Sequence, residues 1–207
     1  MIAILDYGVG NLGSIANMIK RCNGDAAIVS SSDQIAVASG IVLPGVGAFD
    51  IGMSKLKASG LLPTLEHTVF TKKIPVLGIC LGMQLLFESS EEGREQGLGW
   101  IPGNVKRFDF RGCDSARLKV PHMGWNEIRA KADRPLFKHF ETAPRFYFVH
   151  SYYAVCNDEA DIAATCRYGF DFTCAVQKGN VFGVQFHPEK SHKFGMQLFA
   201  NFLELTC

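Results

Sequence analysis

The sequence carries almost no excess of charge of either sign. Its 207 residues include 21 lysines and arginines against 20 aspartates and glutamates, which leaves a net charge of +1. Domains that bind nucleic acid or lie on a membrane surface normally concentrate basic residues on one face. We therefore expect no nucleic acid and no membrane among the binding partners.

Long hydrophobic runs are also missing. Hydrophobic residues make up 47% of the chain, yet no apolar run approaches the roughly 20 residues that a membrane-spanning helix requires. The opening residues 1–6 lack the basic region with which a signal peptide begins. We therefore expect a cytoplasmic protein whose apolar residues form a core.

A third absence concerns metal binding. No two of the seven cysteines are separated by two residues, so the paired spacing of zinc ribbons is missing. A free cysteine otherwise behaves as a small buried hydrophobe. We therefore expect no metal site, no cofactor and mostly buried thiols. The cysteines are Cys22, Cys80, Cys113, Cys156, Cys166, Cys174 and Cys207.

What is present in the first half is an alternation of strand-like and helix-like segments. Short, uninterrupted apolar strands between helices are typical of a parallel sheet that is covered on both faces. The expected strands are Ile2–Leu5, Ala26–Val29, Gly40–Leu43 and Pro75–Ile79. The expected helices are Leu12–Cys22, Asp33–Val37, segments between Ala48 and Lys72, and Leu81–Glu88.

The second half has many short β-like runs and little helical periodicity until its end. A polar loop is expected over Ser89–Gly99 and a closing amphipathic helix over Lys193–Leu205. We therefore predict a single α/β domain, residues 1–207, with a mostly parallel central sheet, helices on both faces and additional antiparallel strands. The expected second-half strands include Val105–Phe108, Trp125–Arg129, Arg145–Val149, Tyr152–Val155, Phe172–Gln177 and Val181–Gln185.

Cys80 lies where one of the expected strands meets a helix. Small residues flank it in the run Gly78-Ile-Cys-Leu-Gly82, and they allow the sharp strand–turn–helix bend called a nucleophile elbow. Helix N-terminal N–H groups favour a thiolate at such a bend. The pattern predicts that Cys80 is the nucleophile of an acyl transfer reaction, with a buried structural cysteine as the alternative.

A candidate base lies far downstream in Phe186-His-Pro-Glu189. Partners of a catalytic cysteine are neighbours in space and not in sequence. Residues i and i+2 of an extended chain point the same way, so Glu189 can reach the ring of His187 if the backbone stays extended through Pro188. The spacing predicts a Cys-His-Glu triad. The alternative is a turn histidine beside a solvated glutamate.

The turn Pro44-Gly-Val-Gly47 follows the strand expected next to that of Cys80. Acyl transfer needs two N–H donors directed at the developing oxyanion. The N–H of Leu81, the residue after the nucleophile, is one candidate, and that of Val46 is the other. An ordinary strand–helix turn is the alternative for residues 44–47.

A glycine pattern near the N-terminus points to a different function. Gly8-Val-Gly-Asn-Leu-Gly13 matches the dinucleotide fingerprint G-x-G-x-x-G. The acidic residue that should end the next strand is missing, because Ser30, Ser31 and Ser32 precede Asp33. Nucleotide binding therefore remains an alternative.

In combination, the elbow, the 44–47 turn and the His-Pro-Glu segment resemble the class I (triad) glutamine amidotransferases, in the same order and over nearly the whole chain. The resemblance implies release of ammonia from L-glutamine and its transfer to a synthase partner. It also implies that Cys80 is the nucleophile, His187 the base and acid, and Glu189 the residue that orients the histidine. The implied glutamine pocket comprises Gly45, Gly47, Gln84, His150, Ser151 and Tyr152.

Within the family, the segments 6–12 and 121–126 are similar to glutaminase subunits of histidine biosynthesis. The implied partner is a (β/α)₈-barrel cyclase that forms imidazole glycerol phosphate with the ammonia, in a heterodimer. Pro121, Met123 and Trp125 would lie at the interface. The glutaminase subunit of an anthranilate or aminodeoxychorismate synthase is the nearest alternative, followed by a cysteine peptidase.

Overall fold

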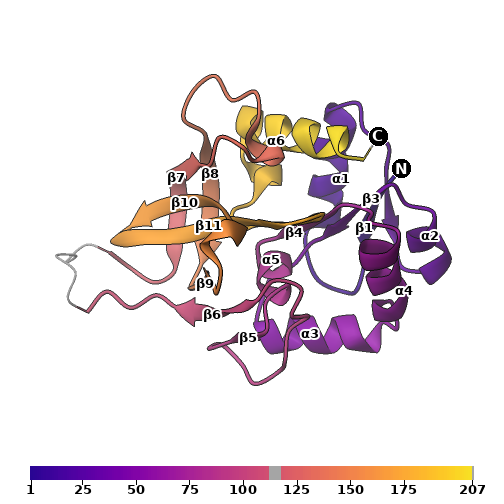
Figure 1. Ribbon diagram of the computed structural model, residues 1–207, viewed down its shortest axis with the longest axis horizontal. Coiled ribbons are helices and arrows are strands. Elements are labelled where there is room, and N and C mark those ends of the chain that lie inside the picture. The colour runs from indigo at the N-terminus through magenta and orange to yellow at the C-terminus, as the bar shows by residue number, and fades with distance from the viewer. Residues whose placement is uncertain (112–117, 207) are drawn as a thin grey trace.

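Short apolar segments form the parallel part of the central sheet. The computed structural model describes residues 1–111 and 118–206 (Figure 1). The parallel strands are adjacent in the order β2 (Ala26–Val29), β1 (Ile2–Leu5), β3 (Gly40–Leu43), β4 (Val76–Ile79) and β12 (Val181–Val184). Every residue of β1, β3, β4 and β12 is buried, because helices cover both faces.

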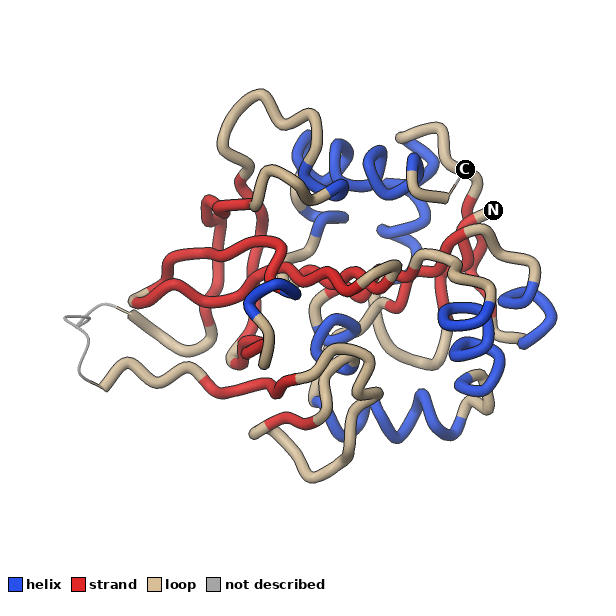
Figure 2. Tube along the Cα trace, in the orientation of Figure 1, coloured by secondary structure: helices blue, strands red, loops and turns tan. Residues whose placement is uncertain are grey.

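The helices divide between the two faces of the sheet (Figures 1 and 2). Helices α1 (Leu12–Arg21) and α6 (His192–Glu204) pack on one face. The other face is covered by α2 (Ser32–Ala36), α3 (Phe49–Ala58), α4 (Leu62–Glu66) and α5 (Leu81–Leu85). A π-helical turn, His67–Thr71, follows α4.

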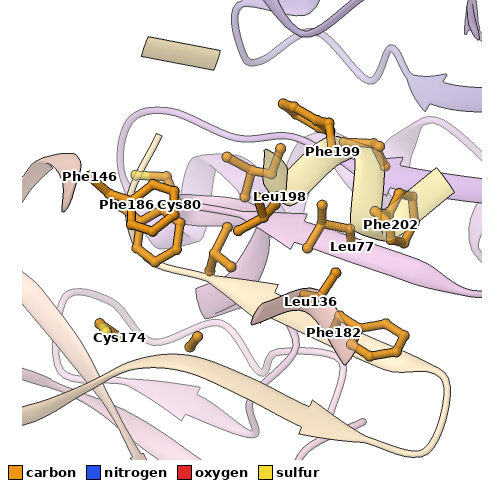
Figure 3. Close-up of a cluster of buried hydrophobic side chains, with 14 of the residues drawn as sticks. Leu77, Cys80, Leu136, Phe146, Cys174, Phe182, Phe186, Leu198, Phe199 and Phe202 are labelled. Atoms are coloured by element: carbon orange, nitrogen blue, oxygen red, sulfur yellow. The ribbon is translucent and has the colours of Figure 1, made fainter. Parts of the chain in front are cut away.

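Phenylalanine side chains dominate the core beneath α6. Figure 3 shows Phe199 and Phe202 of this helix close to Leu77 of β4. Cys80 lies at the end of the same cluster, beside Phe186. The ring of Phe186 stacks on that of Phe146, with centroids 3.9 Å apart. The candidate nucleophile is therefore anchored in the apolar core.

Antiparallel strands extend the sheet beyond β12. They follow in the order β11 (Phe170–Lys178), β10 (Ile162–Tyr168), β7 (His122–Ala130) and β8 (Arg145–His150). Strand β9 (Tyr152–Cys156) pairs with β11 and with β6 (Gly103–Arg107), and β6 also pairs with β5 (Ser89–Ser90). The predicted α/β fold, mostly parallel at its centre with antiparallel strands from the second half, is confirmed.

Most other boundaries shift by one to three residues from the sequence prediction, and three differences lie close to the elbow or to the strand that precedes His187. The elbow helix ends at Leu85 instead of Glu88, because the next N–H groups bond to carbonyls only three residues back and Glu88 pairs with Gly103. The 89–99 loop contains β5. Strand β12 ends at Val184, one residue earlier than predicted. Within the described residues, no helix is long and apolar enough to span a bilayer.

Candidate active site

Cys80 occupies a strained bend between β4 and α5. Its backbone angles, φ 55° and ψ −111°, lie outside the regions that L-residues ordinarily adopt. A Cβ at Gly78 would lie 2.7 Å from the Gly82 carbonyl oxygen, and a Cβ at Gly82 would lie 1.9 Å from that of Leu43. The glycines are therefore required by close backbone contact, and the predicted elbow geometry is present.

His187 and Glu189 form a buried pair, but by a different route from the one expected. The His187 Nδ1 atom lies 2.8 Å from Glu189 Oε1, and both side chains are at most 3% exposed. The backbone does not stay extended, because Pro188–Lys190 forms a 3₁₀ turn. This turn is held by the Ser191 hydroxyl, which donates to the His187 carbonyl at 2.6 Å.

The electrostatics of the histidine ring reflect its two neighbours. Burial lowers the pKa of His187, but the interactions of the ring with Cys80 and Glu189 raise it more, so the net direction is upward. The ring atom Nε2 and the second carboxylate oxygen of Glu189 are buried without a hydrogen-bond partner in the described chain. Nε2 is therefore free to exchange a proton with a group at the cysteine.

A cavity of about 340 Å³ opens beside the sulfur. It brings together residues from the carboxyl ends of strands and from the β8–β9 turn. Its lining consists of Val46, Gly47, Cys80, Leu81, Gln84, Glu92, Pro121, Val149, His150, Ser151, Tyr152 and His187. Of the remaining predicted site residues, Gly45 packs beneath the elbow and Glu189 lies behind the His187 ring.

The turn at residues 44–47 rests directly on the elbow. A Cβ at Gly45 would lie 2.8 Å from the Gly82 nitrogen. Val46 and Leu81 both line the cavity, as an oxyanion site requires, and the first N–H groups of a helix such as α5 have no intrahelical partner. The hydroxyl of Tyr7 donates to the Pro44 carbonyl and thereby fixes the start of the turn.

Comparison with known proteins assigns the family. The sequence model of the family described as "Glutamine amidotransferase class-I" matches residues 3–205. The chain belongs to the class-I glutamine amidotransferases. The resemblance predicted from the motifs is confirmed.

Relatives of this amidotransferase cover its whole length. It is 52% identical over 206 residues to "Imidazole glycerol phosphate synthase subunit HisH 2" of Pseudomonas aeruginosa, with 100% of both chains covered. It is 50% identical to "Imidazole glycerol phosphate synthase subunit HisH" of Leptospira borgpetersenii, with 99% of this chain and 100% of the relative covered.

Solved structures agree at the level of the fold. One described as a glutamine amidotransferase superposes with a TM-score of 0.76 at 19% identity and covers 99% of this chain and 98% of its own. PurLQS from Thermotoga maritima gives 0.74 at 18% identity, with 98% and 97% covered.

Two lining residues of the amidotransferase cavity were missed by sequence reasoning, Glu92 and Val149. Glu92 lies in the polar segment that follows the elbow helix, where no motif marks it. One of its carboxylate oxygens accepts the Phe49 N–H at 2.8 Å. Only a reason to expect a negative charge in the pocket could have singled it out.

The glycine-rich segment that suggested a nucleotide site packs against the 44–47 turn. Gly8 and Gly10 have φ of +83° and +102°, and a Cβ at Gly10 would lie 3.1 Å from the Pro44 Cβ atom. Lys55 donates to the Gly8 carbonyl at 2.6 Å. The glycines therefore permit a close backbone approach beside the cavity.

The residues predicted for a partner interface divide into two groups. Pro121 lines the cavity, whereas Met123 and Trp125 project from β7 with 61% and 39% of their surface exposed. The ring of Trp125 stacks on His192 with an interplanar angle of 2°. The structure thus places an exposed apolar surface next to the mouth of the cavity.

The described cysteines are all free thiols. Cys80, Cys166 and Cys174 are buried, and Cys22 and Cys156 are half-buried. Cys113 and Cys207 lie outside the described residues. Within residues 1–111 and 118–206, no group of three or more histidine, cysteine or acidic side chains could hold a metal ion.

Proposed function

We propose that this chain is the glutaminase subunit of imidazole glycerol phosphate synthase, which hydrolyses L-glutamine to glutamate and ammonia. The observation that carries the proposal is a strained cysteine that shares a cavity with a buried His187–Glu189 pair, in a chain of this family. About 50% identity to HisH subunits over the full length supports the assignment to this synthase.

In the first half of the reaction, the Cys80 thiolate attacks the side-chain amide carbon of glutamine. The tetrahedral oxyanion accepts hydrogen bonds from the N–H groups of Val46 and Leu81. Protonated His187 gives its Nε2 proton to the amide nitrogen, and the C–N bond breaks. Ammonia leaves, and a γ-glutamyl thioester remains on the cysteine.

In the second half, water attacks the thioester. His187 accepts the proton of the water, and Glu189 stabilises the resulting imidazolium through the 2.8 Å contact with Nδ1. Collapse of the second tetrahedral intermediate releases glutamate and restores the thiolate.

The cavity also supplies groups for the amino-acid end of the substrate. Glu92 is the carboxylate among its described lining residues, and one of its oxygens is not engaged by the Phe49 N–H. We assign Glu92 to the α-ammonium group of glutamine. The backbone at Ser151 and Tyr152 would bind the α-carboxylate end, and Gly45, Gly47 and Gln84 would shape the pocket for the side chain.

Ammonia released into water is protonated and lost, so the site should discharge into a partner. The proposed partner is a (β/α)₈-barrel cyclase, which forms a heterodimer through the face that carries Pro121, Met123 and Trp125. The exposure of Met123 and Trp125 beside the cavity supports this face. We propose that residues 1–207 form a single domain that acts in the cytoplasm.

The test is glutamate release by the purified chain, with and without a barrel cyclase subunit carrying its nucleotide ligand. We expect low activity alone, strong activation by the loaded cyclase, and loss of both in Cys80→Ala. Activity without activation would retain the glutaminase and reject the synthase. Inactivity under both conditions would reject the proposal.

A further inference from the structure

Several polar side chains are buried in a core otherwise made of phenylalanine and aliphatic residues. Gln84, His122, His150 and Gln185 are at most 6% exposed. Such groups are costly to bury unless they are hydrogen-bonded. The mechanism above uses none of the side chains of His122, His150 and Gln185, so their presence calls for another explanation.

One end of this polar group reaches the nucleophile. The side-chain amide nitrogen of Gln185 lies 3.8 Å from Cys80 Sγ, with its N–H directed at the sulfur. The amide nitrogen of Gln84 donates to the Gln185 side-chain oxygen at 2.9 Å and to the Tyr152 carbonyl at 3.3 Å. Both hydrogens of the Gln84 amide are thus engaged by the protein.

The same Tyr152 carbonyl connects to strand β7. His150 Nδ1 lies 2.7 Å from this oxygen, and its Nε2 lies 2.9 Å from Nδ1 of His122. The remaining nitrogen of His122 lies 3.1 Å from the side-chain amide of Asn126. A carbonyl only accepts, so His150 donates from Nδ1, and its Nε2 must accept from His122.

The two imidazoles are neutral, which gives the contacts a fixed direction. Burial lowers the pKa of His122 to about 4 and that of His150 to about 3. Each neutral ring has one donor and one acceptor. The donors therefore run from Asn126 to His122, from His122 to His150 and from His150 to the Tyr152 carbonyl.

Strand β7 carries both this buried chain and the exposed apolar surface. Side chains alternate along a strand, so His122 and Asn126 face one side while Met123 and Trp125 face the other. A displacement of β7 by a bound protein would move the first member of the chain directly.

We infer that Gln185 and His122 are positioning residues in one continuous hydrogen-bonded chain that links strand β7 to the sulfur of Cys80. This hydrogen-bonded chain holds the side-chain N–H of Gln185 against the sulfur of Cys80, and it makes that contact depend on the position of β7. This inference rests on the proposed role of Cys80.

The test is the rate at which iodoacetamide alkylates Cys80 in the isolated chain, followed on the Cys80 peptide by mass spectrometry. Gln185→Met keeps the approximate volume and removes the donor. We expect alkylation at neutral pH to slow roughly tenfold, since a hydrogen bond to a charged group stabilises it. The matched control is Gln177→Met on β11, which should leave the rate unchanged.

His122→Phe examines the other end of the chain. Phenylalanine keeps the ring stacking on Phe148 and Tyr168, whose centroids lie 4.8 and 4.1 Å away, but makes no hydrogen bond to His150. We expect alkylation to slow about threefold, a coupling typical of residues in one network. In the double variant, the rate should be no slower than in Gln185→Met alone.

Three further points make the result decisive. The rate is measured over a range of pH, because Tyr7 and His187 interact electrostatically with Cys80 and both remain in every variant. The pH of half-maximal rate should rise in Gln185→Met and stay constant in the control. If Gln185→Met does not fold, Gln185→Leu removes the same donor and introduces no charge.

An unchanged rate in either single variant would overturn the inference. So would equal slowing by His122→Phe in both backgrounds, because independent effects multiply. Alkylation requires neither glutamine nor a partner. A protein with the expected alkylation pattern but no glutaminase activity would therefore refute the proposed function and would leave the hydrogen-bonded chain supported.

Discussion

The two glycines that flank Cys80 differ sharply from Gly13 in the space around them. At Gly82, a Cβ would lie 1.9 Å from the Leu43 carbonyl oxygen, whereas at Gly13 it would meet nothing within 4 Å. Backbone atoms cannot move aside as the end of a flexible side chain can. The requirement at the elbow is therefore steric and lies in the fold itself.

This contrast gives a matched pair of variants. We expect Gly82→Ala to lower the free energy of unfolding by more than about 3 kcal/mol and to abolish glutaminase activity. Gly13→Ala, in the first turn of α1, should raise the free energy of unfolding by about 0.5–1 kcal/mol. Urea unfolding of both variants measures the difference, and equal stabilities would contradict the packing argument.

The buried histidines predict how stability depends on pH. Their folded-state pKa values lie below the unfolded value of 6.5, so the unfolded chain binds more protons and stability falls as the pH drops below 6.5. The slope should approach about 1.4 kcal/mol per pH unit for each histidine. His187, with its raised pKa, contributes a slope of the opposite sign near pH 7, and this slope fades below pH 6.5 as the histidine of the unfolded chain also becomes protonated.

The measurement is urea unfolding between about pH 7 and pH 5. His122→Phe should show a shallower decline than the unchanged chain, because one proton-linked group has been removed. A protein whose stability is flat across this range would show that His122 and His150 are not held neutral.

The thiols should differ in reactivity in a defined way. Burial raises the pKa values of Cys156 and Cys166 to about 12, and that of Cys174 is raised well above its usual range. At pH 7.5 we expect iodoacetamide to label Cys80 before these three, because the thiolate is the nucleophile. Peptide mapping by mass spectrometry gives the order, and labelling of Cys174 first would contradict it.

At the scale of single elements, β7 is the strand through which we expect a partner to act. Trp125→Ala removes a large exposed ring from it, and we expect affinity for the loaded cyclase to fall at least about tenfold. The control is Phe70→Ala, whose ring is 41% exposed near the opposite, amino-terminal edge of the sheet. Titration of the cyclase measures both, and equal losses would reject the proposed face.

The helices and strands were predictable from the sequence where a single physical cause produces the hydrophobic pattern. The strands of the parallel part appear as continuous apolar runs because they are buried on both faces, and Ile2–Leu5 and Gly40–Leu43 match residue for residue. The 3₁₀ turn at Pro188–Lys190 was not predictable. It depends on Ser191, which contacts a carbonyl four residues earlier and the backbone of β8.

The candidate site was likewise predictable only where its residues belong to local motifs. Motifs with a fixed local geometry identified Cys80, His187 and Glu189 as candidates. Glu92 and Gln185 have no such geometry in the sequence, because their significance comes from a backbone N–H 43 residues away and a side chain 105 residues away, respectively. Interactions across such separations become visible only in the folded chain.

At the scale of the whole molecule, the candidate site joins the parallel and antiparallel parts of the sheet. Cys80 follows β4, while the pocket wall at Ser151 lies between β8 and β9. A ligand that contacts both should therefore stabilise them together.

We expect a glutamine analogue that alkylates Cys80 to raise the Tm in a single cooperative transition. A shift of about 2–4 °C is expected for each kcal/mol of stabilisation in a chain of this size. Differential scanning calorimetry provides the measurement, with Cys80→Ser as the unreactive control. Two separate transitions, with only one shifted, would show that the parts do not unfold together.

The contact between the 44–47 turn and the elbow also bears on protein engineering. A Cβ at Gly45 would meet the Gly82 nitrogen, and a Cβ at Gly82 would meet the Leu43 carbonyl, so neither glycine tolerates a side chain while the facing backbone stays in place. If the elbow alone is transplanted into another α/β scaffold, the new protein has the cysteine but lacks the 44–47 turn that we propose for the oxyanion. The two strand ends form one transferable module, and a recipient scaffold must reproduce a backbone approach that leaves no room for a Cβ atom at either glycine.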